Sequence, residues 1–357
     1  MDDALGVVTN RNLQVGHHIL NPEALSFRKA ILSSGSATAR SVLSPSHPRS
    51  VEQLQSMKKY GRNTSMKTLD LDNLLTNSVM IWGAHNQSLT WPFQPVIDGP
   101  GGAIPDSPLV LWEDFLKGEK AAGMAIITGF CSHEGADFVP EKMNSNSDFR
   151  SFFAKLIPAF ADADLDALEK HYPDPATEDS SPYKHTGKEG KQWKRAHEAY
   201  AHYAYICPVI HTAHMLSKAG ARVYLYEYAV PSAPKGLVGH SSQSMAVEHN
   251  VEGIGHNAPG IMTVAKEMNG RWAKFIAAPD GDLGDAWPLF TSPLDGLDGE
   301  GKMLVFGEGN DEGTGGKNAG TAIKERILTS KEKAQCNFWW QRMELSQGMG
   351  AKREKNP

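Results

Sequence analysis

Three short, widely separated apolar runs constrain the fold of this 357-residue chain more than any other feature. They are "RKAILSSGS" at 28–36, "AIITGFCSHEG" at 125–135 and "ARVYLYEYAV" at 221–230. Apolar runs of this length that end in small or turn-forming residues are typical of buried strands, and the β-branched and aromatic residues of the third run favour a strand. Segments with helical features separate the three runs. We therefore expect an α/β fold with a mostly parallel sheet flanked by helices.

Helices are predicted from apolar spacing, capping residues and helix-ending residues. The expected helical segments are 13–27, 71–82, 109–118, 143–172, 194–220 and 261–279. Pro208 should interrupt the long segment 194–220, and Gly220 should end it. The glycine-rich run 307–320 does not fit a phosphate-binding loop, because Asn318 stands where that motif needs Ser or Thr. We expect this run to be a solvated surface loop.

Composition excludes several classes of partner. Hydrophobic residues make up 40% of the chain, enough for a sizeable core, and the formal net charge is −5, which argues against nucleic-acid binding. The apolar runs are too short and too interrupted to span a bilayer. The N-terminus "MDDALGVVTNRN" lacks the basic and apolar regions of a secretory signal. We thus expect neither nucleic acid nor a membrane span.

Metal and cofactor sites are not expected either. There are 14 histidines, but no H-E-x-x-H motif and no carboxylate or thiolate at ligand spacing from the paired histidines. The cysteines, Cys131, Cys207 and Cys336, form no C-x-x-C pair. One disulfide with one free thiol is an alternative, but three reduced and packed cysteines are the favoured interpretation.

Two polar side chains occupy positions where α/β proteins place functional groups. Glu134 follows the second apolar run directly, and carboxylates at the carboxyl ends of parallel strands point into the ligand-binding crevice. The alternative is a capping Glu on a solvated loop. His240 lies ten residues beyond the third run, on a loop flanked by Gly239. A histidine there is usually just exposed, but α/β-hydrolases place their catalytic base on such a loop, after the acid in the chain.

The order of these segments resembles the carboxylesterase type B family, the α/β-hydrolases that include cholinesterases and many fungal esterases and lipases. The resemblance covers most of residues 13 to 306. It is clearest in "VGHHILNPEALSFRKAILSSGS" with its Ser34-Gly35 pair, in "WPFQPVIDGPGGAIPDSP", in "AIITGFCSHEGADFVP", in "RVYLYEY" with "GLVGHSSQ", and in "MNGRWAKFIAAPDGDLGDAWPLF". This resemblance implies a serine-esterase triad whose acid is Glu134 and whose base is His240, a small-molecule carboxylic ester as substrate, and no cofactor.

The chain also departs from the family pattern. No G-x-S-x-G motif, the sharp turn that carries the serine nucleophile, occurs in the sequence. Aligning the family's elbow before Val15 places the nucleophile at Thr9, where the elbow's glycines are absent. The glycine-rich oxyanion loop is absent as well, and Gln243 replaces the usual acidic residue three positions after the base. We therefore expect a partial α/β-hydrolase fold that lacks its N-terminal strands.

These departures shape the functional expectation. Residues 1–12 are expected to be a non-family stub, 13–345 the C-terminal part of the esterase domain, and 346–357 a charged tail. The chain should be an ester hydrolase by family, truncated and inactive as this polypeptide, because serine and oxyanion hole are missing. Alternatives are a dead paralogue and a non-catalytic, cholinesterase-like adhesion module. The presence of both Glu134 and His240 favours the esterase interpretation.

Overall fold

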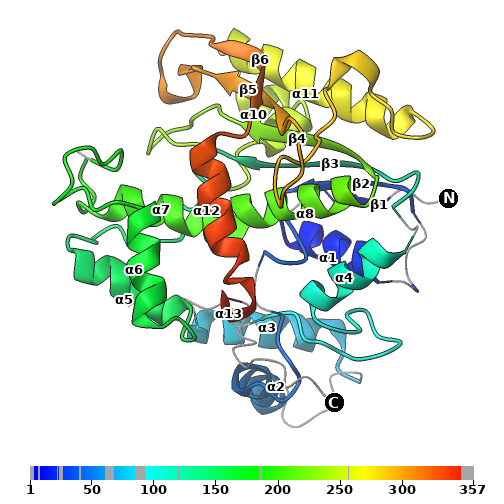
Figure 1. Ribbon diagram of the computed structural model, residues 1–357, viewed down its shortest axis with the longest axis vertical. Coiled ribbons are helices and arrows are strands. Elements are labelled where there is room, and N and C mark those ends of the chain that lie inside the picture. The colour runs from blue at the N-terminus through cyan, green and yellow to red at the C-terminus, as the bar shows by residue number, and fades with distance from the viewer. Residues whose placement is uncertain are drawn as a thin grey trace.

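A six-stranded sheet lies at the centre of the molecule, with helices on both of its faces (Figure 1). The computed structural model describes residues 4–6, 9–21, 23, 27–39, 42–60, 68–85, 93–118, 121–184, 187–255 and 257–346. The strands are β1 (Ala4–Gly6), β2 (Lys29–Ser33), β3 (Ala125–Cys131), β4 (Arg222–Tyr228), β5 (Lys302–Glu308) and β6 (Thr321–Ile327). They lie side by side in chain order, β1 to β5 parallel and β6 antiparallel to β5. The predicted α/β fold with a mostly parallel sheet is confirmed.

The helices occur between and after the strands. The longer ones are α1 (Thr9–Leu20), α2 (Pro48–Tyr60), α3 (Leu71–His85), α4 (Pro108–Lys117), α5 (Asn146–Leu156), α6 (Asp162–His171), α7 (Trp193–Ala201), α8 (Cys207–Lys218), α11 (Pro259–Ala277) and α12 (Ser330–Trp340). Short turns complete the set: the π-helical η1 (His202–Ile206), α9 (Ser244–Val247), α10 (Val251–Ile254), η2 (Gly284–Ala286), η3 (Glu312–Thr314) and α13 (Met343–Ser346).

The central strands bury both faces of the sheet. All residues of β2 and β3 are buried, as expected for parallel strands covered by helices. Successive side chains alternate between two apolar clusters: Ile126 and Phe130 pack on the side of α8, whereas Ile127 and Cys131 join Trp272 of α11. The alternation follows from the two-residue period of a strand. Polar side chains with access to a ligand can then stand only at the sheet's ends, where the strands give way to loops.

Several elements differ from the expectation. β5 and β6 were not predicted, and neither was α12, which follows the segment 261–279 that was expected to be the last helix. The glycine-rich run is confirmed as a loop from residue 309 to residue 320, where it joins β5 to β6, whereas Gly307 and Glu308 belong to β5. β6 is an edge strand with many half-exposed and exposed side chains, so its apolar signal is weak. β1 also was not predicted. It lies inside the segment 1–12 and pairs with β2.

The cysteine expectation was wrong for two of the three residues. Cys207 at the start of α8 and Cys336 in α12 form a disulfide, across 129 residues of chain, and Cys131 is a buried free thiol. The expected break at Pro208 takes the form of the π turn η1 just before it. Proline has no N–H with which to continue the helical ladder, so the chain adjusts in the turn that precedes it.

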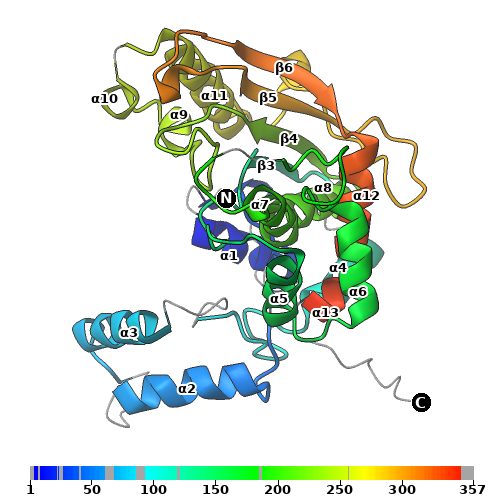
Figure 2. The ribbon, with the colours of Figure 1, turned by 90° about the vertical axis from the view of Figure 1, so that its left-hand side faces the viewer.

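Helices α2 and α3 stand apart from the sheet and the helices packed on it (Figure 2). Of the helices that the structure describes, none has both the length and the apolar character needed to cross a membrane. The expected charged tail lies outside the described residues from 347 onward.

Candidate active site

Glu134 lies in the tight turn that follows β3. Its side chain is fully buried. The backbone N–H of Cys131, the last residue of β3, donates a hydrogen bond of 2.7 Å to Glu134 Oε1. The turn is closed by a bond from the N–H of Ala136 to the carbonyl oxygen of His133. The strand therefore ends by aiming a carboxylate across the carboxyl edge of the sheet rather than toward solvent.

His240 reaches the same point from the loop that follows β4. Two hydrogen bonds hold this loop against the β3 turn: His133 N–H donates to the carbonyl of Val238 at 2.9 Å, and Val238 N–H donates to His133 Nδ1 at 3.2 Å. The imidazole Nδ1 of His240 hydrogen-bonds Oε2 of Glu134. The two residues that the sequence singled out, from two separate strands, are thus brought into direct contact.

Ser34 completes the shell around the carboxylate. It directly follows β2, its backbone N–H donates to the carbonyl of Gly129 at 2.7 Å, and its Oγ donates to Glu134 Oε1. Its φ of 56° lies in the left-handed region, which is uncommon for a residue other than glycine. Glu134 thus accepts from a backbone N–H, a hydroxyl and an imidazole. A buried carboxylate needs such donors, because leaving it unpaired is strongly unfavourable.

The role of Ser34 was missed from sequence, although the Ser34-Gly35 pair was noted as a family feature. The signal that could have found it is its position: it ends β2, the strand that pairs with β3. Carboxyl ends of neighbouring parallel strands meet at one edge of the sheet. Sequence reasoning did not establish that β2 and β3 are neighbours.

A second buried group lies beside Glu134. The Sγ of Cys131 donates a 2.9 Å hydrogen bond to Oε1 of Gln243, which is itself buried. Burial, and secondarily the nearby charge of Glu134, raises the pKa of the Cys131 thiol well above its usual value. Gln243 is the residue that departs from the family's acidic pattern, and here it serves as the acceptor for this thiol.

Aromatic side chains cover the imidazole of His240. The ring centroids of Tyr205 and His240 are 4.3 Å apart, and those of Phe138 and His240 are 5.6 Å apart. The side chain of His240 is 11% exposed, so the imidazole is largely shielded from water, while the side chain of Glu134 has no exposure at all. Neither aromatic residue was identified from sequence.

In chemical terms, the pair is arranged for proton transfer. The Glu134 carboxylate accepts a hydrogen bond from Nδ1 of His240, so the proton of a neutral His240 sits on Nδ1. Nε2 is then the nitrogen that can take a proton from a reacting group. Among the described residues no hydroxyl hydrogen-bonds Nε2, and none of their His, Cys, Asp and Glu side chains gather in threes as a metal site would need. Thr9, the position that the resemblance aligns with the nucleophile, begins α1 shortly after β1 ends.

The sequence is similar to known proteins over the segment that contains this site. Residues 13–296, which include Glu134 and His240, match the family model described as Carboxylesterase family. Secreted lipase 4 of Gibberella zeae is 32% identical over 204 residues, which make up 54% of this chain and 35% of that protein. The chain spans about a third of the length of this curated relative in that match.

Proposed function

The chain belongs to the carboxylesterase family, and on this premise we propose that Glu134 and His240 are the acid and the base of an ester-hydrolysing triad. The observation that supports this most is the hydrogen bond between His240 Nδ1 and Glu134 Oε2, formed by residues 106 positions apart in the chain. The substrate class is a carboxylic ester. The likeness to a protein named as a lipase supports this class.

Each residue has one task in the proposed reaction. His240 Nε2 takes the proton of a hydroxyl nucleophile as that oxygen attacks the ester carbonyl, and later returns the proton to the departing alcohol oxygen. Glu134 holds the ring in the tautomer with the proton on Nδ1 and stabilises the imidazolium that forms. Ser34 and the N–H of Cys131 keep the carboxylate in place by donating hydrogen bonds to Oε1 of Glu134, the oxygen that does not bond His240.

We also propose that this polypeptide by itself hydrolyses esters very slowly. The sequence contains no G-x-S-x-G motif, and the aligned position holds Thr9 without the glycines of a nucleophile elbow. An acid–base pair without its nucleophile and oxyanion hole loses several orders of magnitude in rate. The proposed inactivity thus follows from the missing nucleophile motif, whereas the proposed acid and base roles concern Glu134 and His240 alone.

The acid–base roles are tested by Glu134→Gln. Oε1 of Glu134 accepts hydrogen bonds from the N–H of Cys131 and from the hydroxyl of Ser34. The amide oxygen of a Gln must therefore take the place of Oε1, so that it can accept both bonds. The amide NH₂ then faces His240, whose Nδ1 must become an acceptor. We expect ¹⁵N NMR of labelled histidine to show the proton moving from Nδ1 to Nε2. An unchanged tautomer would contradict the proposed roles.

The proposed inactivity is tested by hydrolysis of p-nitrophenyl butyrate. The parent chain should release p-nitrophenol no faster than its His240→Ala variant, with both samples shown to be folded by circular dichroism. A rate that depends on His240 would overturn the inactivity proposal and would at the same time support the base role of His240.

A further inference from the structure

A single π-helical turn interrupts the rod formed by α7, η1 and α8. Its backbone bond runs from the N–H of Cys207 to the carbonyl of His202, five residues earlier. Such turns shift the side chains that follow by one residue relative to a plain α-helix, and they are often found at functional sites. Tyr205 lies in this turn. The Tyr205 ring therefore contacts its neighbours from an irregular point of the rod.

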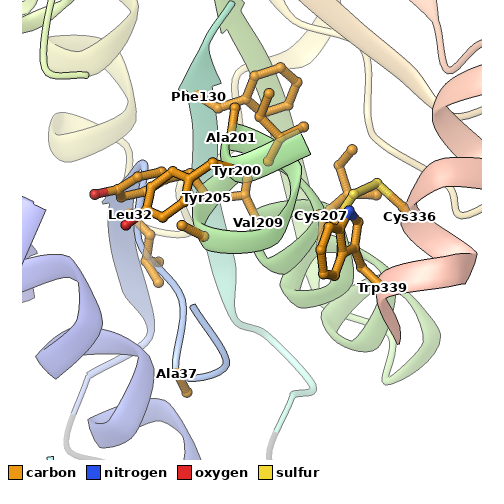
Figure 3. Close-up of a cluster of buried hydrophobic side chains, with 14 of the residues drawn as sticks. Leu32, Ala37, Phe130, Tyr200, Ala201, Tyr205, Cys207, Val209, Cys336 and Trp339 are labelled. Carbon is orange, nitrogen blue, oxygen red and sulfur yellow. A yellow bond between two sulfur atoms is a disulfide. The ribbon is translucent and has the colours of Figure 1, made fainter. Parts of the chain in front are cut away.

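The Tyr205 ring lies against the imidazole of His240. The centroids are 4.3 Å apart and the two planes are inclined by 37°. Phe138 contacts the same imidazole with its edge, and the Phe138 and Tyr205 rings are themselves 5.6 Å apart. Tyr205 is 2% exposed, so the contact is excluded from water. Figure 3 shows Tyr205 among the buried side chains near β2 and β3, with the Cys207–Cys336 bond further along the same rod.

The rod itself is anchored on both sides of Tyr205. In α7, the carbonyl of His197 lies so close to Gly135 that no side chain fits between them. Beyond Tyr205, the disulfide joins Cys207 to Cys336. In addition, Trp340 Nε1 donates a hydrogen bond of 2.9 Å to the carbonyl oxygen of Cys207. One continuous helical rod thus contacts the turn of Glu134 at one point and the ring of His240 at another.

We propose that Tyr205 is a positioning residue, which acts by holding the imidazole of His240 in the orientation that keeps Nδ1 on Glu134. The proposal rests on the proposed function, since it concerns the base of the same pair. The contact that carries this proposal is the one between the Tyr205 ring and the imidazole. Aromatic contacts of this kind add specific attraction beyond burial, and an aromatic face also attracts a ring that becomes cationic, as His240 does during proton transfer.

The test follows the proton on His240 Nδ1 by NMR in the full chain. The rate at which this proton exchanges with water reports how firmly the imidazole is held against Glu134. Tyr205→Leu removes the ring, and the exchange should become about three- to tenfold faster, the range expected from the strength of one aromatic contact. Tyr205→Phe keeps the ring and should retain the parent rate.

A matched control is available in the same turn. The Tyr203 ring packs 5.5 Å from Trp339 and 5.8 Å from Tyr200, and no ring contact joins it to His240. Tyr203→Leu should therefore leave the exchange rate of the His240 proton unchanged. If Tyr205→Leu does not fold, Tyr205→Met replaces it, because Met fills irregular space without a ring.

The outcomes separate this proposal from the proposed function. A folded variant without the ring that exchanges at the parent rate, or an equal acceleration in Tyr203→Leu, would overturn the role of Tyr205. So would an acceleration in Tyr205→Phe as large as in Tyr205→Leu, since the hydroxyl would then be responsible. Glu134→Gln reports on the acid–base pair independently: if it switches the tautomer while the Tyr205 variants change nothing, only the role of Tyr205 fails.

Discussion

The backbone of Gly135 lies directly against the carbonyl oxygen of His197. A Cβ atom on Gly135 would stand 1.9 Å from that oxygen, far inside van der Waals contact. The turn that holds Glu134 and the first helix of the α7–α8 rod are therefore in backbone contact. A glycine is needed after Glu134 because any side chain would force these two elements apart.

Gly135→Ala should lower the free energy of unfolding by about 1 to 3 kcal/mol, the usual range for overpacking a rigid site. Because the clash is with backbone, relief requires moving the turn, and Glu134 would move with it. We expect a lower urea midpoint together with an altered ¹⁵N shift of His240 Nδ1. A stable variant with an unchanged His240 signal would contradict the close approach.

A glycine in open space serves as the control. Gly270 lies inside α11, and apart from its chain neighbours and the adjacent helix backbone, no atom of the described residues lies within 4 Å of a Cβ built there. Gly270→Ala should raise the free energy of unfolding by roughly 0.5 to 1 kcal/mol, because alanine restricts the unfolded chain and favours helix. Opposite signs for two Gly→Ala changes would separate the steric effect at Gly135 from the general effect of losing a glycine.

The disulfide between Cys207 and Cys336 should contribute measurably to stability. It closes a loop of 129 residues, and cross-links over loops of this size stabilise folded proteins by about 2 to 5 kcal/mol. A Cys207→Ala/Cys336→Ala double variant should melt at lower temperature than the parent. Reductant should lower the melting temperature of the parent and leave that of the double variant unchanged; a parent that is insensitive to reductant would refute the cross-link.

Cys131 should be chemically inert in the folded protein. Its thiol is fully buried, and its raised pKa keeps it protonated at pH 8, whereas alkylation needs the thiolate. We expect mass spectrometry to find no iodoacetamide label on the folded chain, one label in denaturant and three labels in denaturant with reductant. Labelling of the folded chain at Cys131 would show that the thiol beside Glu134 is accessible.

His17 in α1 should make the protein sensitive to acid. Its side chain is buried, neither ring nitrogen has a hydrogen-bond partner in the described residues, and burial, with a smaller effect of His18, lowers the pKa of His17 to about 4. In the unfolded chain His17 is therefore protonated as the pH falls below about 6.5, whereas in the folded chain it is protonated only near pH 4. Stability is complete above this interval and falls as the pH drops through it, by about 3 kcal/mol in all.

His17→Leu should flatten this dependence, because the side chain can no longer be protonated in the unfolded state. Urea unfolding at pH 7.5 and at pH 4.5 would measure the difference. The exposed neighbour provides the control: His18→Gln should retain most of the acid sensitivity, since burial of His17 is the main cause. Equal acid sensitivity in the parent and in His17→Leu would exclude His17 as the source.

Local patterns were enough to predict several elements and to single out Glu134 and His240 as candidates, whereas their proposed roles came from the family resemblance. The apolar runs that became β2, β3 and β4 are short, continuous and bounded, so each could be identified within its own segment. Glu134 and His240 could be named because each follows a recognisable strand. β6 was missed because none of its residues is buried and polar residues interrupt its apolar ones, which leaves no continuous apolar run.

The contacts between these elements could not be obtained in the same way. That Ser34 reaches Glu134 depends on β2 lying next to β3, and the two residues are 100 positions apart. Tyr205 contacts His240 from within a π turn, and the pairing of Cys207 with Cys336 depends on α12 packing beside α8. The sequence by itself determined which residues form strands and helices, because propensity and apolar period act over a few neighbours. Only the tertiary structure decided which side chains meet, because sheet order and helix packing are set by burial across the whole chain.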